Sequence, residues 1–482
     1  MTVMPHWLSK QSFLQPDKSA VEYKDGSFVT FRELERRSKE MAGVLYNMGV
    51  REKDHVAILS PNDPSFMEIV YGLSYLGARV VLLNVRLTSQ ELLYQVNDAE
   101  ASLLLFEPSQ SDKVESLREE LQVVSFSDLE GKATVPGLKE EIDLDEVFTM
   151  MYTSGTTGNP KAVLHTYGNH WFSAISSALN LGLTQDDKWL LNLPVFHISG
   201  FSTLMKNVIY GMTIEFHESF EEDEVLRSMK ERGVTMISGV SVMLERLIDV
   251  VAKEDIPSSF RCFLLGGGPA TKHLLERAQD KNIPVFQTYG MTETTSQIAT
   301  LAPQDAVRKL GSAGKALATA SLYIEAEKGY VGEIMVAGPM VSEGYYKKER
   351  RQGRFFATGD MGYLDEEGFL YVSGRKKEMI ISGGENIYPA EIENVLAGVE
   401  GVEEIAVAGV SDETWGEVPA AFVSGRNVKR EAIISRCKHG LARYKHPAYI
   451  FRVPQLPRNA SNKVLKRRLV EMVEAGDLDE LE

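Results

Sequence analysis

Cysteine is scarce in this chain, and its scarcity limits the chemistry that the protein can use. The sequence holds 2 cysteines, Cys262 and Cys437, which lie far apart and belong to no C-x-x-C pair or Cys/His cluster. Neither a disulfide framework nor a zinc site is therefore predicted. Such usage fits a reducing compartment, so we expect a cytoplasmic protein.

Long apolar runs and an excess of basic charge are also missing. No uninterrupted apolar stretch approaches membrane-spanning length, and the N-terminus "MTVMPHWLSKQ" lacks a basic region followed by an apolar one, so neither an anchor nor an export signal is predicted. The 52 Lys and Arg against 68 Asp and Glu give a net charge of −16. This field repels nucleic acid and anionic membranes, so any polyanionic ligand must be held by a local site.

The remaining composition is that of a globular protein with several subdomains. The 482 residues are 43% hydrophobic and 25% charged, which is enough to bury sizeable cores. Helical periodicity alternates with short apolar strands over residues 31–106 and again over 167–289, which predicts two layered α/β subdomains with largely parallel strands. Residues 320–373 show short strands broken by glycines, which is typical of a small β-rich subdomain.

The end of the chain has a different pattern. A charge-dense segment, Gly374 to Glu378, separates two apolar strands, and Pro389 opens a helix beyond it. We predict a large N-terminal domain over residues 1–376 and a small, mobile α+β domain over 377–482, with Lys377 as the hinge. An ordinary linker lysine is the alternative for Lys377.

One loop contains unusually many small and hydroxylated residues. The stretch "MYTSGTTGNPKAVLHT", Met151 to Thr166, lies between two short apolar runs. Glycines allow close backbone approach, hydroxyls and amides donate hydrogen bonds, and a lysine adds positive charge, so the loop can wrap phosphate oxygens. The candidate phosphate ligands are Thr153, Ser154, Gly155, Thr156, Thr157, Gly158 and Lys161. It does not match the Walker A pattern, and a plain Ser/Thr/Gly-rich hairpin loop is the alternative.

The order of these residues is more informative than their composition. The run Y-T-S-G-T-T-G-x-P-K resembles the phosphate loop of the adenylate-forming acyl-CoA synthetase superfamily, which includes aryl-CoA ligases, peptide-synthetase adenylation domains and beetle luciferases. Further motifs follow in the superfamily's order across nearly the whole chain. The resemblance implies the superfamily's fold and ATP-dependent activation of a carboxylic acid. Ala162 replaces the usual Gly, and we expect altered loop mobility with function retained.

The segment "YGMTE", Tyr289 to Glu293, resembles the superfamily's adenine and metal site. The resemblance implies that Tyr289 stacks on adenine beside Gly290, that Thr292 contacts the α-phosphate, and that Glu293 holds Mg²⁺. An aromatic face suits the base, and a hard carboxylate suits a hard cation that also binds phosphates. On its own, this pentapeptide would be an ordinary turn.

Glycines and an Asp/Arg pair complete the nucleotide site that the resemblance implies. "GGGP", residues 266–269, resembles the segment lining the adenine and acyl pockets, where Gly267 and Gly268 leave room for a ligand. "TGD", which ends at Asp360, resembles the ribose site, with Arg375 as the partner of the carboxylate. In isolation, a turn and a solvated surface charge are the alternatives.

Near the end of the chain, "RNASNKVLKRR" resembles the superfamily's final motif and places its catalytic lysine at Lys463. Asn462 stands where the superfamily commonly has Gly. The resemblance implies that Lys463 assists attack on the α-phosphate of ATP, and that the C-terminal domain then rotates about Lys377 before CoA attacks the acyl-adenylate.

Acid specificity is expected in "PVFHISGFSTLMKNVIYG", Pro194 to Gly211. His197 stands where many aryl-CoA ligases place an aromatic residue or His against the acyl ring, although a satisfied buried imidazole is the alternative. Lys206 lies in an apolar helical pattern, where it either extends to water or recognises a second carboxylate on the substrate. The remaining pocket residues implied by the resemblance are Ser238, Gly239, Gly268 and Thr288.

The expected ligands are therefore an aromatic dicarboxylic acid, ATP with Mg²⁺, and CoA as co-substrate. Several stretches together resemble aryl-CoA ligases in particular. A ligase for benzoate- or coumarate-type acids, a stand-alone aryl or amino-acid adenylating enzyme, and a luciferase-like oxygenase are the alternatives. A homo-oligomer also stays open at this point.

Overall fold

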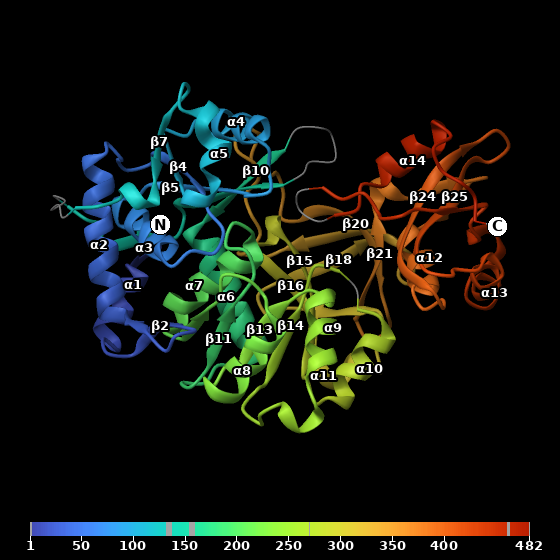
Figure 1. Cartoon of the computed structure of the whole chain (residues 1–482), viewed down its shortest axis with the longest axis horizontal. Coiled ribbons are helices and arrows are strands. Elements are labelled where there is room, and N and C mark those ends of the chain that lie inside the picture. The colour runs from blue at the N-terminus through green and yellow to red at the C-terminus, as the bar shows by residue number, and fades with distance from the viewer. Residues whose placement is uncertain (1, 132–136, 154–159, 269, 460–462, 482) are drawn as a thin grey trace. The chain divides into compact units, whose positions relative to one another are not determined.

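The computed structural model describes residues 2–131, 137–153, 160–268, 270–459 and 463–481 (Figure 1). Their contacts divide the chain into two compact units, the first made of Met1–Leu322 with Val336–Phe356 and the second of Tyr323–Met335 with Ala357–Glu482. Both units combine helices and strands, as predicted. Over these described ranges, no helix is long and apolar enough to cross a membrane.

The first sheet of the first unit has the strand order β10-β9-β5-β4-β6-β7. Neighbouring strands are parallel except β10, which is antiparallel to β9. The strands are β4 (His55–Leu59), β5 (Arg79–Leu83), β6 (Leu103–Phe106), β7 (Gln122–Ser125), β9 (Val147–Thr153) and β10 (Lys161–Thr166). Helices α3 (Ser65–Leu76) and α4 (Ser89–Asp98) follow β4 and β5 along the chain. This repetition of strand and helix confirms the first predicted α/β subdomain.

The second sheet of this unit runs in the order β17-β16-β15-β14-β13-β11-β12-β2-β3. Its central strands are parallel: β11 (Lys188–Leu191), β12 (Thr213–Phe216), β13 (Met236–Gly239), β14 (Cys262–Leu265) and β15 (Val285–Met291). The helices between them are α7 (Ile198–Tyr210), α8 (Glu222–Glu231), α9 (Ser241–Val250) and α10 (Lys272–Asp280). The second α/β subdomain is therefore confirmed too.

Strands from outside the predicted repeat complete this sheet. β16 (Ser296–Leu301) is antiparallel to β15, and β17 (Ser312–Ala316) is antiparallel to β16. β2 (Ser19–Tyr23) pairs with β12 although it precedes the whole first sheet in sequence, and β3 (Phe28–Thr30) pairs with β2. Sequence periodicity did not predict this long-range pairing, since it carries no information on which sheet a short strand joins.

Successive side chains of a strand point to opposite faces of the sheet and therefore enter two separate hydrophobic cores. In β4, Val56 and Ile58 belong to a large core shared with the second sheet, whereas Ala57 and Leu59 face a core covered by α4. The large core also holds residues of α2 (Phe31–Asn47), α3 and α7. The other face of the second sheet packs on α8, α9 and α10. Helix α7 is thus enclosed in the large core, where a charged residue needs a specific explanation.

The smaller elements of the first unit connect these layers. β1 (Val3–Pro5) pairs with β8 (Glu141–Asp143), and α6 (Tyr167–Leu181) directly follows β10. The remaining helices are α1 (Trp7–Leu14), α5 (Ser111–Val114) and α11 (Pro303–Ala306).

The second unit contains the predicted short strands and the α+β segment. β18 (Ser321–Glu325), β19 (Gly332–Ala337), β20 (Phe356–Leu364) and β21 (Leu370–Arg375) are neighbours in that order. Beyond them, β22 (Ile380–Ser382), β23 (Glu385–Ile387), β24 (Val402–Asp412), β25 (Gly416–Gly425) and β26 (Tyr449–Arg452) form a 5-stranded sheet. The helices are α12 (Pro389–Leu396), α13 (Arg430–Gly440) and α14 (Lys466–Glu474), and α12 begins at Pro389 as predicted.

The contact-based division differs from the expected domain boundary at residue 376. It assigns residues from Ala357 onward, and the segment Tyr323–Met335, to the second unit. The hinge at Lys377 concerns a movement rather than compactness, and it stays a prediction.

Candidate active site

The predicted phosphate-binding loop lies between two paired strands. Thr153 at the end of β9 lies opposite Lys161 at the start of β10, so the two flanks of the loop pair as antiparallel strands. The intervening predicted ligands fall outside the described residues: Ser154, Gly155, Thr156, Thr157 and Gly158. Ala162, which replaces the superfamily's usual Gly, is accommodated by the fold. Its side chain is buried in the core beside α4, and its carbonyl accepts a 2.8 Å hydrogen bond from the Tyr346 amide.

The glycine-rich segments meet at the carboxyl ends of parallel strands. Ser238 and Gly239 end β13, and β14 beside it leads into Gly266, whose amide donates to the Gly239 carbonyl at 3.0 Å. A Cβ on Gly239 would lie 2.6 Å from the Phe263 ring, so only glycine fits. Ligands of open α/β sheets bind at these strand ends, where side chains from neighbouring strands converge.

The neighbouring strand β15 carries the predicted adenine segment. Thr288 donates to the Ala299 carbonyl at 3.0 Å, and the register shifts between Tyr289 and Gly290. A Cβ on Gly290 would lie 1.9 Å from the Ser296 carbonyl oxygen, so this close approach requires glycine.

The adjoining Gly-rich turn is more open. Gly267 has φ +86°, a left-handed conformation that favours glycine, and Gly268 has open space at its Cβ position. Pro269 lies outside the described residues. Residues of β13, β14 and β15 that were predicted to line the adenine and acyl pockets are therefore neighbours.

Glu293, the predicted metal ligand, is held by side chains and backbone from several segments. The Tyr345 hydroxyl donates to Glu293 Oε1 at 2.9 Å, and the Ser342 amide donates to the Glu293 carbonyl at 2.8 Å. The same Tyr345 ring lies 5.5 Å from the ammonium of Lys161. Tyr345 thereby connects the predicted metal ligand with the lysine of the phosphate loop.

The backbone of the preceding residue, Thr292, is held by a buried histidine. His165 Nε2 donates to the Thr292 carbonyl at 2.8 Å, and the ring is completely buried. Burial lowers the pKa of His165 to about 4, so the imidazole is neutral at physiological pH. A hydrogen bond between His165 and Thr149, 3.2 Å long, fixes its other nitrogen.

The donor set around Glu293 fits Mg²⁺ bound together with nucleotide. Mg²⁺ in ATP sites is usually held by one or two carboxylates together with phosphate oxygens and waters. Within the part of the chain that the structure describes, no group of three or more His, Cys, Asp or Glu could form a complete protein cage for a metal ion. A single carboxylate suits a cation whose other ligands come from ATP and water.

Lys206 is the most unusual charged residue of the site. It lies in α7 with 1% of its surface exposed. Among the described residues it makes neither an ion pair nor a hydrogen bond, and its ammonium lies 4.3 Å from the centroid of the Trp189 ring. Burial lowers the pKa of Lys206 to about 8. The alternative that its stem extends the charge to water is therefore wrong.

His197 lies at the residue before α7, and a buried asparagine holds the segment that carries it. The Asn62 side chain donates to the carbonyls of Leu193 and His217 at 3.1 and 3.0 Å, and its oxygen accepts from the Val195 amide at 2.9 Å. His197 is half-buried, and its ring packs on Phe196 with centroids 4.6 Å apart. Asn62 thus fixes the backbone immediately before His197.

In the second unit, Asp360 and Arg375 form a pair across β20 and β21. They are directly opposite in the antiparallel register, and Arg375 Nε donates to Asp360 Oδ1 at 2.9 Å. Arg375 also donates to the Thr358 carbonyl at 3.2 Å. Asp360 is buried with 6% of its surface exposed, which suits a carboxylate held in a fixed direction.

The two lysines of the second unit that were predicted as hinge and catalytic residue are both exposed. Lys377 lies in a short 3₁₀ helix, Lys376–Glu378, directly after β21. Lys463 exchanges two hydrogen bonds with Asn459: its amide donates to Asn459 Oδ1 and its carbonyl accepts from the Asn459 amide, each at 2.9 Å. Asn462 lies outside the described residues.

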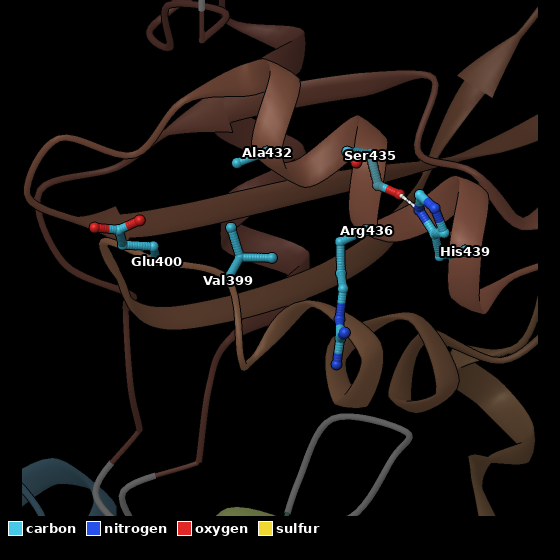
Figure 2. Close-up of a pocket in the computed structure, with 6 residues that line it drawn as sticks. All are labelled: Val399, Glu400, Ala432, Ser435, Arg436 and His439. Atoms are coloured by element: carbon cyan, nitrogen blue, oxygen red, sulfur yellow. Dashed lines mark hydrogen bonds between the residues drawn. The ribbon is translucent and has the colours of Figure 1, made fainter.

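A separate hollow in the second unit has a volume of about 350 Å³ (Figure 2). It is lined by Val399, Glu400, Ala432, Ser435, Arg436 and His439. None of the predicted site residues lines it, so it is no part of the candidate active site.

Four residues that contact the site were missed at the sequence level: Asn62, His165, Trp189 and Tyr345. None of the four belongs to a sequence motif that indicates a particular reaction or ligand. Their roles follow from contacts between residues far apart in sequence, such as Tyr345 and Lys161, and periodicity does not encode such contacts.

Comparisons with known proteins define the family. Residues 8–346 match the model of the AMP-binding enzyme family, and residues 391–463 match the model of the AMP-binding enzyme C-terminal domain. The chain therefore belongs to the AMP-binding enzymes and, within them, to the 2-succinylbenzoate–CoA ligase family. This confirms the superfamily that the motifs indicated.

Individual relatives are similar over almost their full length. The 2-succinylbenzoate–CoA ligase of Oceanobacillus iheyensis is 52% identical over 477 residues, covering 96% of this chain and 98% of that protein. The enzyme of the same name from Geobacillus kaustophilus is 48% identical, covering 98% and 99%.

A solved structure of the o-succinylbenzoate CoA synthetase from Bacillus subtilis, in complex with the acyl-adenylate intermediate, has a TM-score of 0.93 and 45% identity. It covers 97% of this chain and 98% of its own. A second structure of that enzyme, with ATP and a magnesium ion, has a TM-score of 0.92. These similarities confirm the predicted fold and cofactors.

Proposed function

We infer that the protein is an ATP-dependent acid–thiol ligase that adenylates 2-succinylbenzoate and transfers it to CoA, giving 2-succinylbenzoyl-CoA, AMP and pyrophosphate. Relatives named 2-succinylbenzoate–CoA ligase align with nearly the whole chain. An enzyme with this specificity serves menaquinone biosynthesis. The observation that carries the choice of acid is the buried Lys206, which has no anionic partner among the described residues.

The first half-reaction forms the acyl-adenylate. A carboxylate oxygen of the acid attacks the α-phosphorus of ATP, a P–O bond forms, and the bond to pyrophosphate breaks. Negative charge shifts to the leaving phosphates, so cations and donors must already be in place. Mg²⁺, when bound, neutralises part of this charge. Of the chain's own residues, Glu293 orients the metal, Thr292 and Lys463 contact the α-phosphate, and Lys161 holds the departing phosphates.

A further group of predicted residues binds the nucleoside part of ATP in this proposal. Tyr289 supplies the aromatic face for adenine, and Gly267, Gly268 and Gly290 leave room for the ring. Asp360 accepts hydrogen bonds from the ribose hydroxyls. Its pairing with Arg375 supports this role, because an arginine fixes the direction of this buried carboxylate.

The second half-reaction forms the thioester. The CoA sulfur attacks the acyl carbon, a C–S bond forms, and the C–O bond to AMP breaks. Lys463 has no role at this carbon, so we propose that the residues beyond Lys377 rotate between the two steps. Exposure of Lys377 in a short turn after β21 supports a hinge there.

Recognition of the diacid follows from the charge of the pocket. One carboxylate of 2-succinylbenzoate is activated, and the other needs a counter-charge. Lys206 supplies it, since an isolated buried ammonium binds an anion more strongly than an exposed one does. Ser238, Gly239, Thr288 and His197 line the aryl part of the pocket.

Ligases for monocarboxylic aryl acids are the second candidate. A benzoate- or coumarate-type acid has no second carboxylate and would leave the ammonium of Lys206 desolvated and unpaired, at a cost in binding. The charge at residue 206 therefore favours the diacid.

A panel of acids tests this function. The purified protein is incubated with ATP, Mg²⁺ and 2-succinylbenzoate, benzoate, coumarate or amino acids, with and without CoA, and pyrophosphate release and acyl-CoA are measured. We expect 2-succinylbenzoyl-CoA to be the main product, with adenylation observable in the absence of CoA. Preferred use of a monocarboxylic acid, or adenylation that never proceeds to a thioester, would contradict the proposal.

The setting in the cell stays a proposal as well. Both cysteines are buried free thiols, which agrees with the expected reducing cytoplasm.

A further inference from the structure

Trp189 occupies a central place under the helix that carries the acid-binding lysine. It is the second residue of β11 and lies opposite Ile214 of β12 and Met236 of β13. Its side chain is 1% exposed and faces the large core with α7, whereas the next residue, Leu190, faces the opposite core. An indole at this position is therefore fixed on all sides by the sheet and the helix.

Two contacts of the indole involve residues already implicated in acid binding. The face of the ring lies 4.3 Å from the ammonium of Lys206. The edge of the ring donates a hydrogen bond from Nε1 to Ser238 Oγ at 3.1 Å. Lys206 comes from α7 and Ser238 from β13, so Trp189 contacts predicted acid-binding residues on two separate elements.

The aromatic face stabilises the buried ammonium and still leaves room for the anion of a substrate, which a carboxylate would not. A buried ammonium without compensation is costly, and a protein Asp or Glu would stabilise it but would also occupy the position of the substrate's anion. A cation–π contact stabilises the charge without supplying a competing anion. The thiol of Cys262 interacts electrostatically with Lys206, but burial raises the pKa of this thiol to about 12, so it supplies no negative charge at neutral pH.

The hydrogen bond at the ring edge has a separate consequence. Because the indole N–H can only donate, Ser238 Oγ accepts, and the hydroxyl hydrogen stays available to donate. No other hydrogen bond of the Ser238 side chain occurs within the described ranges, so its hydroxyl hydrogen can be donated to a bound acid.

We propose that Trp189 is a positioning residue for the acid: its face holds Lys206 as a buried cation without a competing protein anion, and its edge sets Ser238 as a donor, so that the site selects a substrate with a second carboxylate. This inference rests on the proposed function of the site and adds the residue that organises it. Trp189 itself does not touch the reacting atoms.

Three variants separate the two contacts. Trp189→Phe keeps an aromatic face and removes the N–H, and Trp189→Leu removes both. Ser238→Ala removes the hydroxyl that accepts from the indole and donates to the acid. Adenylation is followed by pyrophosphate release with 2-succinylbenzoate and with its analogue that lacks the non-activated carboxylate. We expect the KM for the diacid to rise about tenfold in Trp189→Leu and by less in Trp189→Phe, with the KM for ATP unchanged. The effects of Trp189→Phe and Ser238→Ala should not add, since both remove one hydrogen bond.

The pH profile of kcat/KM for the acid distinguishes positioning from a purely structural role. Loss of the aromatic face destabilises the ammonium, so the upper limb of the profile should move to lower pH in Trp189→Leu and stay in place in Trp189→Phe. Equal losses with diacid and monoacid, or an unmoved profile in every variant, would overturn the inference. If Trp189→Leu fails to fold, Trp189→Phe and Ser238→Ala still decide it through their additivity.

Failure of the proposed function is recognised separately. It appears in the wild-type protein as poor use of 2-succinylbenzoate relative to a monoacid, whatever the Trp189 variants do. Wild-type preference for the diacid together with unaffected Trp189 variants contradicts only the present inference.

Discussion

The Tyr345 hydroxyl donates to Glu293 Oε1 at 2.9 Å while its ring lies 5.5 Å from the Lys161 ammonium. One side chain thus contacts both the expected metal ligand and the lysine of the phosphate loop. The geometry predetermines the carboxylate direction before ATP and Mg²⁺ bind, and such preorganisation is what stabilises developing charge during phosphoryl transfer.

Removing the Tyr345 hydroxyl should weaken this arrangement without removing the ring. For Tyr345→Phe we expect the apparent affinity for Mg·ATP in adenylation to fall about tenfold, because a hydrogen bond to a charged group contributes about 1.5 kcal/mol. Pyrophosphate release measured over a Mg²⁺ titration tests this. An unchanged Mg²⁺ dependence would show that Tyr345 does not orient Glu293, and the KM for the acid serves as internal control.

Acid binding should depend on pH through Lys206. Burial lowers the pKa of its ammonium to about 8, so the free enzyme carries the cation below this pH and loses it above. The KM for 2-succinylbenzoate should therefore be constant below about pH 8 and rise up to about tenfold per pH unit above it. Adenylation without CoA is the appropriate assay, because the CoA thiol does not titrate in it. The rise should vanish in Lys206→Met; a rise that persists there would assign it to another group.

Buried histidines should make the fold sensitive to acid. Burial lowers the pKa of His6 to about 3 and that of His165 to about 4, against 6.5 unfolded. The unfolded chain therefore takes up protons first as the pH falls below 6.5, and stability is lost between this value and the folded pKa values. At pH 5.5 each histidine should lower the free energy of unfolding by about 1.4 kcal/mol relative to pH 7.5.

Urea unfolding at the two pH values measures this loss. His6 stacks on Tyr75 with ring centroids 3.8 Å apart, so His6→Phe preserves a ring contact. This variant should lose less stability on acidification than the wild type. The same loss in both would show that His6 is not responsible.

Substitution of Lys463 should affect the two half-reactions differently. Lys463→Ala should abolish adenylation measured by pyrophosphate release, yet leave thioester formation from supplied acyl-adenylate and CoA largely intact. The physical reason is that the ammonium stabilises charge on the α-phosphate and has no partner at the acyl carbon. Equal loss in both steps would falsify the division of labour between two domain positions.

The sequence predicted most of the architecture where local signals are strong. The apolar helical pattern around Lys206 occurs as α7, Ile198–Tyr210, and α12 begins at Pro389, because apolar periodicity and helix-start signals are local. The pairing of β2 with β12 was missed, since register between distant strands is set by tertiary packing.

The site residues also divide into those that local motifs predict and those that only tertiary contacts reveal. The glycines of β13 to β15 could be named from motifs because close backbone approach admits no other residue, as at Gly239 and Gly290. Periodicity placed Lys206 in an apolar helix but could not show that it is buried, because a lysine stem can reach water from many such positions. The contact with Trp189 lay beyond any local pattern, since β11 and α7 meet only in the folded chain.

The most direct test of the account combines Lys206→Met with two analogues of 2-succinylbenzoate, each lacking one of its carboxylates, and measures kcat/KM for adenylation. The analogue without the activated carboxylate should not react, and the other should react poorly with the wild type. Lys206→Met should lower kcat/KM for the diacid by about a hundredfold and leave the reactive monoacid unchanged, with no loss of thermal stability, since an unpaired buried charge is removed. An equal loss with both acids would contradict the claim that Lys206 binds the second carboxylate.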